Sequence, residues 1–135
     1  MLLTKEGDYG ARIIRTLANG EKKAVAVICE NEHIPIPFAY KILKKMEHAG
    51  LLKGIRGRNG GYKLIKSLDE ITLYDVLAAV DETIFLFECL SDRRHCPLNS
   101  ADSPCAVHLE LDRMQNLLIA EMQKKTMREV LQIDG

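Results

Sequence analysis

Apolar residues recur three and four positions apart in several stretches of the chain, a spacing that places them on one face of a helix. The first stretch runs from Thr4, whose side chain can cap a helix, to Asn19-Gly20, a pair that can end one. A later stretch begins at Pro37, where the missing N–H is no loss to a first helical turn. The predicted helices span about residues 4–19, 24–31, 37–48, 72–80, 108–125 and 126–131.

A different pattern separates the third and fourth of these helices. Residues 51–55 form a short apolar run, residues 56–61 read Arg-Gly-Arg-Asn-Gly-Gly, and residues 62–65 alternate as a strand does. The pattern predicts a two-stranded hairpin with Arg56 and Arg58 at its tip. Two short helices joined by a tight turn and followed by such a hairpin form a winged helix-turn-helix. The predicted fold is therefore mainly α with a small β-hairpin.

The same periodicity predicts which side chains are buried. In the second helix we expect Val27 and Ile28 to face inward and Cys29 to be a small buried hydrophobe. Residues 84–87, Ile-Phe-Leu-Phe, are expected to form a buried run. The long helix carries an apolar stripe that a second copy of the chain would bury, with packing on its own domain as the alternative. The stripe comprises Val107, Leu111, Met114 and Leu118, widened by Leu117 and Met122.

Charge is divided between the two halves of the chain, although the net charge is zero. Residues 1–66 hold 13 Lys and Arg against 6 Asp and Glu, and residues 67–135 hold 6 against 13, so the halves carry +7 and −7. With the winged helix-turn-helix, this split favours double-stranded DNA as a partner over a merely solvated basic surface. The third helix would enter the major groove and the wing the minor groove. The side chains predicted to contact DNA are Phe38, Tyr40, Lys41, Lys44, Arg56 and Arg58.

Three of the four cysteines fall within one stretch that lacks helical or strand periodicity. They are Cys89, Cys96 and Cys105, and His108 follows at Cys-x-x-His spacing. Three thiolates and an imidazole can hold an iron–sulfur cluster or a zinc ion. A metal-free thiol switch, in which these cysteines form disulfides, is the third alternative. The spacing does not choose among the three.

These features divide the chain into a winged helix-turn-helix DNA-binding domain (1–83), a cysteine-rich cluster-binding loop (84–107), and a dimerisation helix with a short C-terminal helix (108–135). No long apolar run and no signal peptide are present, so we expect no membrane partner and a cytoplasmic protein with reduced thiols. Motifs of phosphate loops, nucleophile elbows and zinc proteases are absent. A Cys29–His33 nucleophile and base is better explained by helix-turn-helix packing, so we expect no enzyme.

Several motifs together resemble one known family. They are Leu3-Thr4-x-x-Gly7-x-Tyr9, Gly50-Leu51-Leu52, Arg56-Gly57-x-x-Gly60-Gly61-Tyr62, Ile71-Thr72-Leu73 with Val80-Asp81, Cys105-x-x-His108, and Thr126-x-x-Glu129. Over nearly its whole length the chain resembles the IscR/NsrR-type winged-helix regulators of bacteria. The resemblance implies a homodimeric transcription factor that senses iron–sulfur supply, nitric oxide, iron or redox state, and we expect a repressor.

The resemblance also implies a ligand set. IscR-like members hold a [2Fe–2S] cluster through three cysteines and a histidine, which correspond here to Cys89, Cys96, Cys105 and His108. NsrR-like members hold a [4Fe–4S] cluster through three cysteines and an acid near the start of the partner's first helix, where this chain has Asp8. The chain contains both sets, and its cysteine loop is longer than in the best-known members, so the cluster type stays open.

In the DNA-binding half, the resemblance assigns the wing arginine of the family, which enters the minor groove, to Arg56. Tyr40 stands where IscR-like proteins carry a glutamate that helps to select operators. This difference argues against switching between operator classes.

Overall fold

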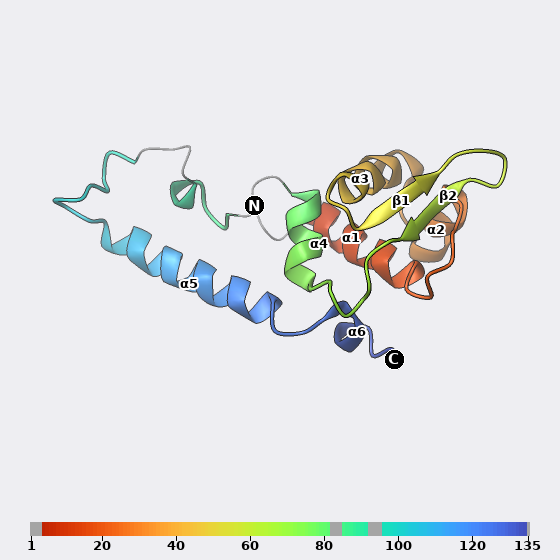
Figure 1. Ribbon diagram of the computed structural model, residues 1–135. Helices are drawn as coiled ribbons and strands as arrows, with labels where there is room; N and C mark the ends of the chain where they lie inside the picture. The colour runs from red at the N-terminus through yellow and green to blue at the C-terminus, as the bar shows by residue number, and fades with distance from the viewer. Residues whose placement is uncertain (1–3, 82–84, 92–95, 135) are drawn as a thin grey trace.

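The structure is a computed structural model that describes residues 4–81, 85–91 and 96–134. Its elements are α1 Lys5–Thr16, α2 Val25–Glu32, α3 Ile36–His48, β1 Leu52–Ile55, β2 Gly61–Leu64, α4 Leu73–Val80, the 3-10 turn η1 Glu88–Leu90, α5 Ala106–Met122 and α6 Met127–Val130. In Figure 1, α1–α4 and the hairpin gather into one unit, α5 extends away from it, and α6 lies back beside it. The predicted mainly helical fold with one hairpin is confirmed. Among the described residues, no helix combines the length and apolar character needed to cross a bilayer.

An aliphatic core forms where α1, α3 and α4 face one another. Ile13 on α1, Ile42 on α3 and Val76 on α4 are fully buried, and each such side chain contributes about 1.5–3 kcal/mol through its removal from water. A glycine lets α1 and α4 approach closely. A Cβ on Gly7 would clash with Leu77 Cδ2, so a larger residue there would force Leu77 to move.

The helix-turn-helix consists of α2 and α3. The last turn of α2 ends at His33, which adopts a left-handed φ of 54°, and α3 begins after Pro35. Ile28 and Cys29 are buried as predicted. Val27 is 42% exposed, so its predicted inward orientation is wrong. Neighbouring residues of a helix point in different directions, and this short helix buries only one narrow face.

The hairpin is joined to the helix-turn-helix by backbone hydrogen bonds. Strands β1 and β2 pair antiparallel, with Leu52 opposite Leu64. The residue before α2 adds a further rung: Lys23 N donates to Tyr62 O, and Tyr62 N donates to Lys23 O, both at 2.9 Å. The wing therefore has one fixed attachment to the segment that leads into α2.

The C-terminal end of α5 is anchored to the same unit. Met122 at that end packs against α4. Just beyond it, Thr126 forms a bridge with Thr72, and Met127 N donates to Ile71 O at 2.6 Å. Met127 is itself buried. The long helix is thus fixed at one end to the unit that carries α3.

The middle of the chain departs from the predicted burial. Phe87 is 49% exposed, so the buried run predicted over 84–87 is wrong at that position. Residue 84 of this run lies outside the described residues, as does residue 3 of the N-terminal motif. On α5, Val107 is 66% exposed and Met114 is 46% exposed, whereas Leu118 packs near α4. α4 has 8 residues and α5 has 17, so α4 is too short to cover the whole stripe.

Candidate nucleic-acid interface and metal-ligand segment

One face of α3 is open to solvent beside the hairpin. Phe38 and Tyr40 are half exposed, and Lys41 and Lys44 are exposed on the same helix. The ring of Phe38 leans on that of Tyr9 in α1, with the ring centroids 6.5 Å apart. The structure therefore brings the four predicted DNA-contacting residues of this helix to its outer surface, with Phe38 partly engaged by α1.

Glu6 of α1 neutralises part of this face. Its two carboxylate oxygens lie 3.1 Å from Lys41 Nζ and 3.2 Å from Lys45 Nζ, and Lys45 Nζ also donates to Val80 O at 3.0 Å. The pKa of Glu6 lies below its ordinary value, and the hydrogen bond from Lys41 is the largest cause. Burial acts in the opposite direction, but Lys41 and Lys45 together outweigh it. No local sequence pattern indicates this role of Glu6, because the paired lysines are 35 and 39 positions away.

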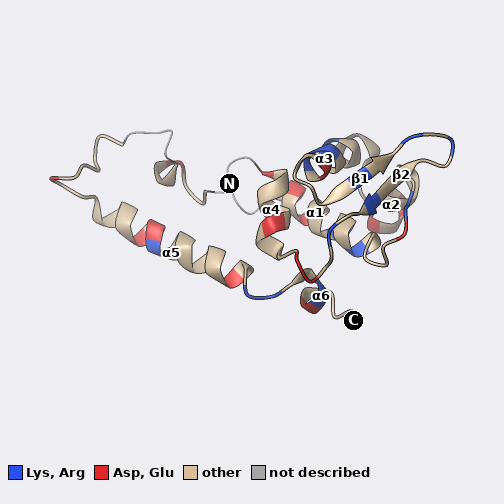
Figure 2. Ribbon diagram, in the orientation of Figure 1, with Lys and Arg blue, Asp and Glu red and all other residues tan. Residues whose placement is uncertain are grey.

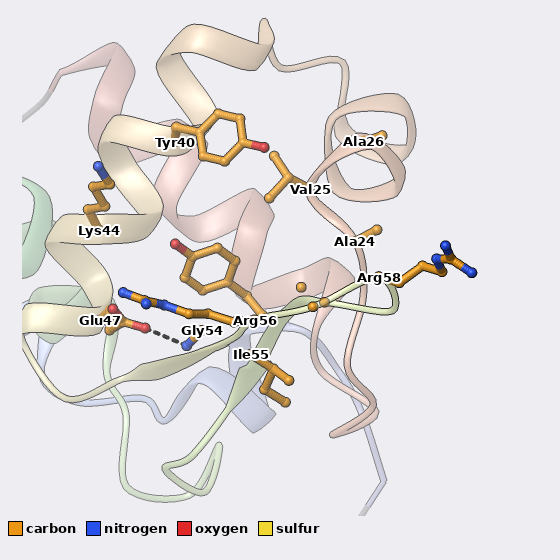
Figure 3. Close-up of a pocket in the computed structure, with 14 residues that line it drawn as sticks. Ala24, Val25, Ala26, Tyr40, Lys44, Glu47, Gly54, Ile55, Arg56 and Arg58 are labelled. Atoms are coloured by element: carbon orange, nitrogen blue, oxygen red, sulfur yellow. Dashed lines mark hydrogen bonds between the residues drawn. The ribbon is translucent and has the colours of Figure 1, made fainter.

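A groove of about 660 Å³ separates α3 from the hairpin. In Figure 3, Tyr40, Lys44 and Glu47 project from α3 along this groove. The side chain of Arg56 lies along the groove, whereas Arg58 points outward from the hairpin. The two wing arginines therefore have different orientations, which their positions in the turn did not reveal.

Glu47 of α3 links the two sides of the groove by a hydrogen bond to the hairpin. Its Oε2 accepts a hydrogen bond from the backbone N–H of Gly54 in β1. Burial, and then the charges of Glu47 and Tyr40, raise the pKa of the Tyr62 phenol above its ordinary value. The phenol hydroxyl can donate a hydrogen bond in the groove. The available sequence signal for Glu47 was its position as the one acid among eight basic residues between Lys41 and Lys66.

The charge split of the sequence is also a split in space. In Figure 2, the ribbon is coloured for Lys and Arg at several positions of α3 and the hairpin, and for Asp and Glu on α4 and along α5. A basic surface around a groove attracts a phosphate backbone, and the attraction weakens as salt is added. The predicted polyanion-binding side is therefore the α3–hairpin side.

The cysteine segment leads into α5. Cys89 lies in η1, Cys105 is the N-cap residue of α5, and His108 is in its first turn. Cys96 follows a stretch outside the described residues. The thiols of all three cysteines are half-buried and free. Cys105 N donates to Asn99 Oδ1 at 2.8 Å, which holds the loop against the start of the helix.

Two further observations mark this segment. Leu86 N donates to Oε1 of the buried Gln115 at 2.8 Å, which ties the segment to the middle of α5. Nδ1 of His108 is buried, and within the described part of the chain it has no hydrogen-bond partner. A buried polar atom without a partner costs about 1–3 kcal/mol, so a bound ligand that used this nitrogen would remove the penalty.

The predicted ligands do not converge in the single chain. Among residues 4–81, 85–91 and 96–134, no three His, Cys, Asp or Glu side chains are placed to hold a metal ion. Asp8 accepts two hydrogen bonds from Arg12, from Nε at 3.2 Å and from Nη2 at 2.7 Å, rather than facing the cysteines. The donor chemistry of the three cysteines and His108 fits an iron–sulfur cluster or zinc.

The helix-turn-helix, the attached hairpin and the basic groove define a winged-helix DNA-binding protein. The chain belongs to the Rrf2 family, because the model of that family, described as an iron-dependent transcriptional regulator, matches residues 3–133. It is therefore a DNA-binding transcriptional regulator. The expectation that it is not an enzyme is confirmed.

Individual relatives support this assignment. Protein aau3 of Rhizobium meliloti is 33% identical over 134 residues, which cover 97% of this chain and 85% of that protein. The structure of CymR (YrzC), the global cysteine regulator of B. subtilis, matches with a TM-score of 0.75 at 20% identity and covers 98% of both chains. The T. potens IscR structure matches with a TM-score of 0.73 at 18% identity, covering 96% of this chain and 85% of that one. These likenesses confirm the fold.

Proposed function

We propose that this regulator is a homodimeric, cytoplasmic repressor whose affinity for its operator depends on an iron–sulfur cluster. Residues 1–83 bind DNA, residues 84–107 hold the cluster, and residues 108–135 form the dimer. Three thiolates come from Cys89, Cys96 and Cys105. The fourth ligand is His108 for a [2Fe–2S] cluster or Asp8 of the partner subunit for a [4Fe–4S] cluster.

The buried Nδ1 of His108 is the observation that carries this proposal. This nitrogen lies one helical turn after Cys105, at a helix start held by the loop, and the described residues leave it unpartnered. Beside it in sequence are three free, half-buried thiols. A bound cluster supplies a reversible one-electron couple and a target for oxidants and nitric oxide. The chain's own residues hold it and respond to its loss.

The exposed stripe on α5 supports a homodimer. Val107 and Met114 are large apolar side chains that the single chain leaves open, and they lie seven residues apart on one helical face. Two-fold pairing of α5 with its copy would bury both. The start of α5 would then carry the cysteine ligands next to the dimer contact.

The anchoring of α5 gives a route from the cysteine segment to DNA. The segment is bound to the start of α5 through Cys105 and to its middle through Gln115. The C-terminal end of α5 packs on α4, and Met127 just beyond it is bonded to Ile71. α4 packs on α1 and α3. Ordering of residues 84–107 would therefore set the distance between the two copies of α3, which must match successive major grooves.

Anaerobic isolation tests the ligand assignment. We expect a coloured protein with iron and sulfide in the wild type and in Cys29→Ala, which removes a buried thiol outside the segment. The variant with Cys89, Cys96 and Cys105 all changed to Ala should be colourless. One equivalent of zinc in iron-replete protein would establish a structural zinc site instead. Metal-free protein whose mass falls by pairs of hydrogens after mild oxidation would establish a thiol switch.

A further inference from the structure

The start of β1 is held on α3 by a backbone hydrogen bond from Leu51 N to Met46 O at 3.0 Å and by the buried side chain of Leu52. Further along the hairpin, two hydrogen-bonded attachments to the helix-turn-helix follow, one through backbone atoms and one through a side chain. The backbone rung between Lys23 and Tyr62 fixes the hairpin to the segment before α2. The second attachment is the hydrogen bond from Gly54 N to Glu47 Oε2, which fixes β1 to the last turns of α3. Figure 3 shows this bond at the floor of the groove between the helix and the wing.

The second attachment depends on a glycine. A Cβ on Gly54 would lie 2.7 Å from Glu47 Oε2 and 3.2 Å from Tyr62 Cε1. Gly54 faces Tyr62 across the hairpin, so the carboxylate and the phenol ring both crowd the space that a side chain would fill. Glycine weakens a strand interior, and it is used where another group approaches the backbone closely. Three elements, α3, β1 and β2, thus meet at this position.

The charge of Glu47 runs against the rest of its surface. It is the one acid between Lys41 and Lys66, a segment with eight basic residues. It also faces the groove that Lys44 and Arg56 line. On electrostatic grounds alone, a carboxylate on a phosphate-binding surface lowers affinity.

We infer that Glu47 is a positioning residue for DNA binding, which clamps the wing to the recognition helix through Gly54. The clamp fixes the separation between α3, which reads the major groove, and the wing arginines Arg56 and Arg58. Without the bond to Glu47, the outer part of the wing would be held only by the Lys23–Tyr62 rung and by the contacts at the start of β1, and it could shift relative to α3. Its arginines would then be ordered at the moment of binding, at a cost in affinity. This inference rests on DNA binding and does not involve the cysteine segment.

The clamp and simple electrostatics predict opposite changes in DNA affinity when Glu47 is replaced. Two substitutions at this position therefore distinguish them. Glu47→Ala removes both the charge and the acceptor, whereas Glu47→Gln removes the charge and keeps an amide oxygen that can accept from Gly54 N. The clamp predicts that Glu47→Ala binds DNA about tenfold more weakly and that Glu47→Gln binds at least as well as wild type. Charge alone predicts that both variants bind more tightly than wild type.

Gly54→Ala provides an independent test, because its methyl group displaces the Glu47 carboxylate without changing any charge. The clamp predicts a loss similar to that of Glu47→Ala. It also predicts that Arg56→Ala costs much less in the Glu47→Ala background than in wild type, because the wing is already loose. The difference between the cost of Arg56→Ala in wild type and its cost in the Glu47→Ala background is the coupling energy of a double-mutant cycle.

The experiment measures affinity for a duplex of about 30 base pairs, long enough for two half-sites one turn apart, selected from a random pool by the wild-type protein. Each variant is compared with wild type in both the reconstituted and the chelator-treated form, and thermal midpoints confirm folding. Tighter binding by Glu47→Ala, or additive losses with Arg56→Ala, would overturn the inference. Equal losses in Glu47→Gln and Glu47→Ala would also overturn the inference. They would indicate that the Glu47 carboxylate contacts DNA directly and accepts a hydrogen bond from a cytosine amino group.

Discussion

Glu32 is a buried charged residue, 6% exposed, at the junction of α1 and α2. Its carboxylate accepts hydrogen bonds from Arg15 at 3.0 and 2.5 Å and from Thr16 at 2.8 Å. Glu32→Ala should lower the free energy of unfolding by about 2 kcal/mol, because it leaves these donors without a buried partner. Denaturant titration measures the loss. Glu30→Ala, an exposed acid on the same helix, is the control and should change little.

The Glu32 carboxylate also determines the direction in which folding stability changes with pH. Burial alone would raise the pKa of Glu32, but the hydrogen bonds from Arg15 and Thr16 outweigh it, and the folded-state pKa lies below the ordinary value. Its contribution to stability is therefore fully present above the unfolded pKa of about 4.3 and is lost as the pH falls through the folded pKa. The stability difference between wild type and Glu32→Gln should shrink on acidification. A difference that stays constant down to about pH 3 would contradict this assignment.

Glu6 gives a prediction with a gain of affinity. Because it pairs with Lys41 and Lys45, Glu6→Gln should release both cations toward phosphate. We expect about threefold tighter DNA binding at low salt and a salt dependence steeper by about one counterion. Glu110→Gln makes the same charge change on α5 and serves as the control. If both variants bind alike, the pairing with α3 has no bearing on DNA affinity.

Among the elements, α5 carries an apolar stripe that its own chain leaves partly exposed. Met114→Glu places a charge in the exposed stripe, whereas Asn116→Glu places the same residue on the far side of the helix. Light scattering should give wild type and Asn116→Glu a mass of twice the 15.2 kDa chain, and Met114→Glu a mass near that of one chain. A dimeric Met114→Glu would place the dimer contact elsewhere.

Local signals predicted the elements well. Thr72 and Asp75 form both bonds of a capping box, and the Arg-Gly-Arg-Asn-Gly-Gly turn lies between two paired strands. These features depend on residues within a few positions of one another. The pairing of Glu6 with Lys41 and the direction of Arg56 depend on packing between elements, which no local pattern encodes. Phe87 was assigned to the interior on hydrophobicity alone, whereas its side chain is 49% exposed.

In the whole molecule, the winged-helix unit could be predicted because its elements are periodic and its charge is segregated. The cysteine segment could be predicted only as a set of donor types. It has no periodicity to fix its path, and in the single chain its donors do not meet at any described position. A site that a ligand or a second copy completes leaves no geometric signal in one chain alone.

A direct measurement of the central claim compares DNA affinity before and after oxidation of anaerobically reconstituted protein. Wild type and Cys29→Ala should each change their affinity for the selected duplex by about tenfold, because in the proposed function the bound centre sets the spacing of the two α3 helices. The variant with Cys89, Cys96 and Cys105 replaced by Ala should bind with one affinity throughout. If all three proteins bind identically in every oxidation state, the cysteine segment does not control DNA binding.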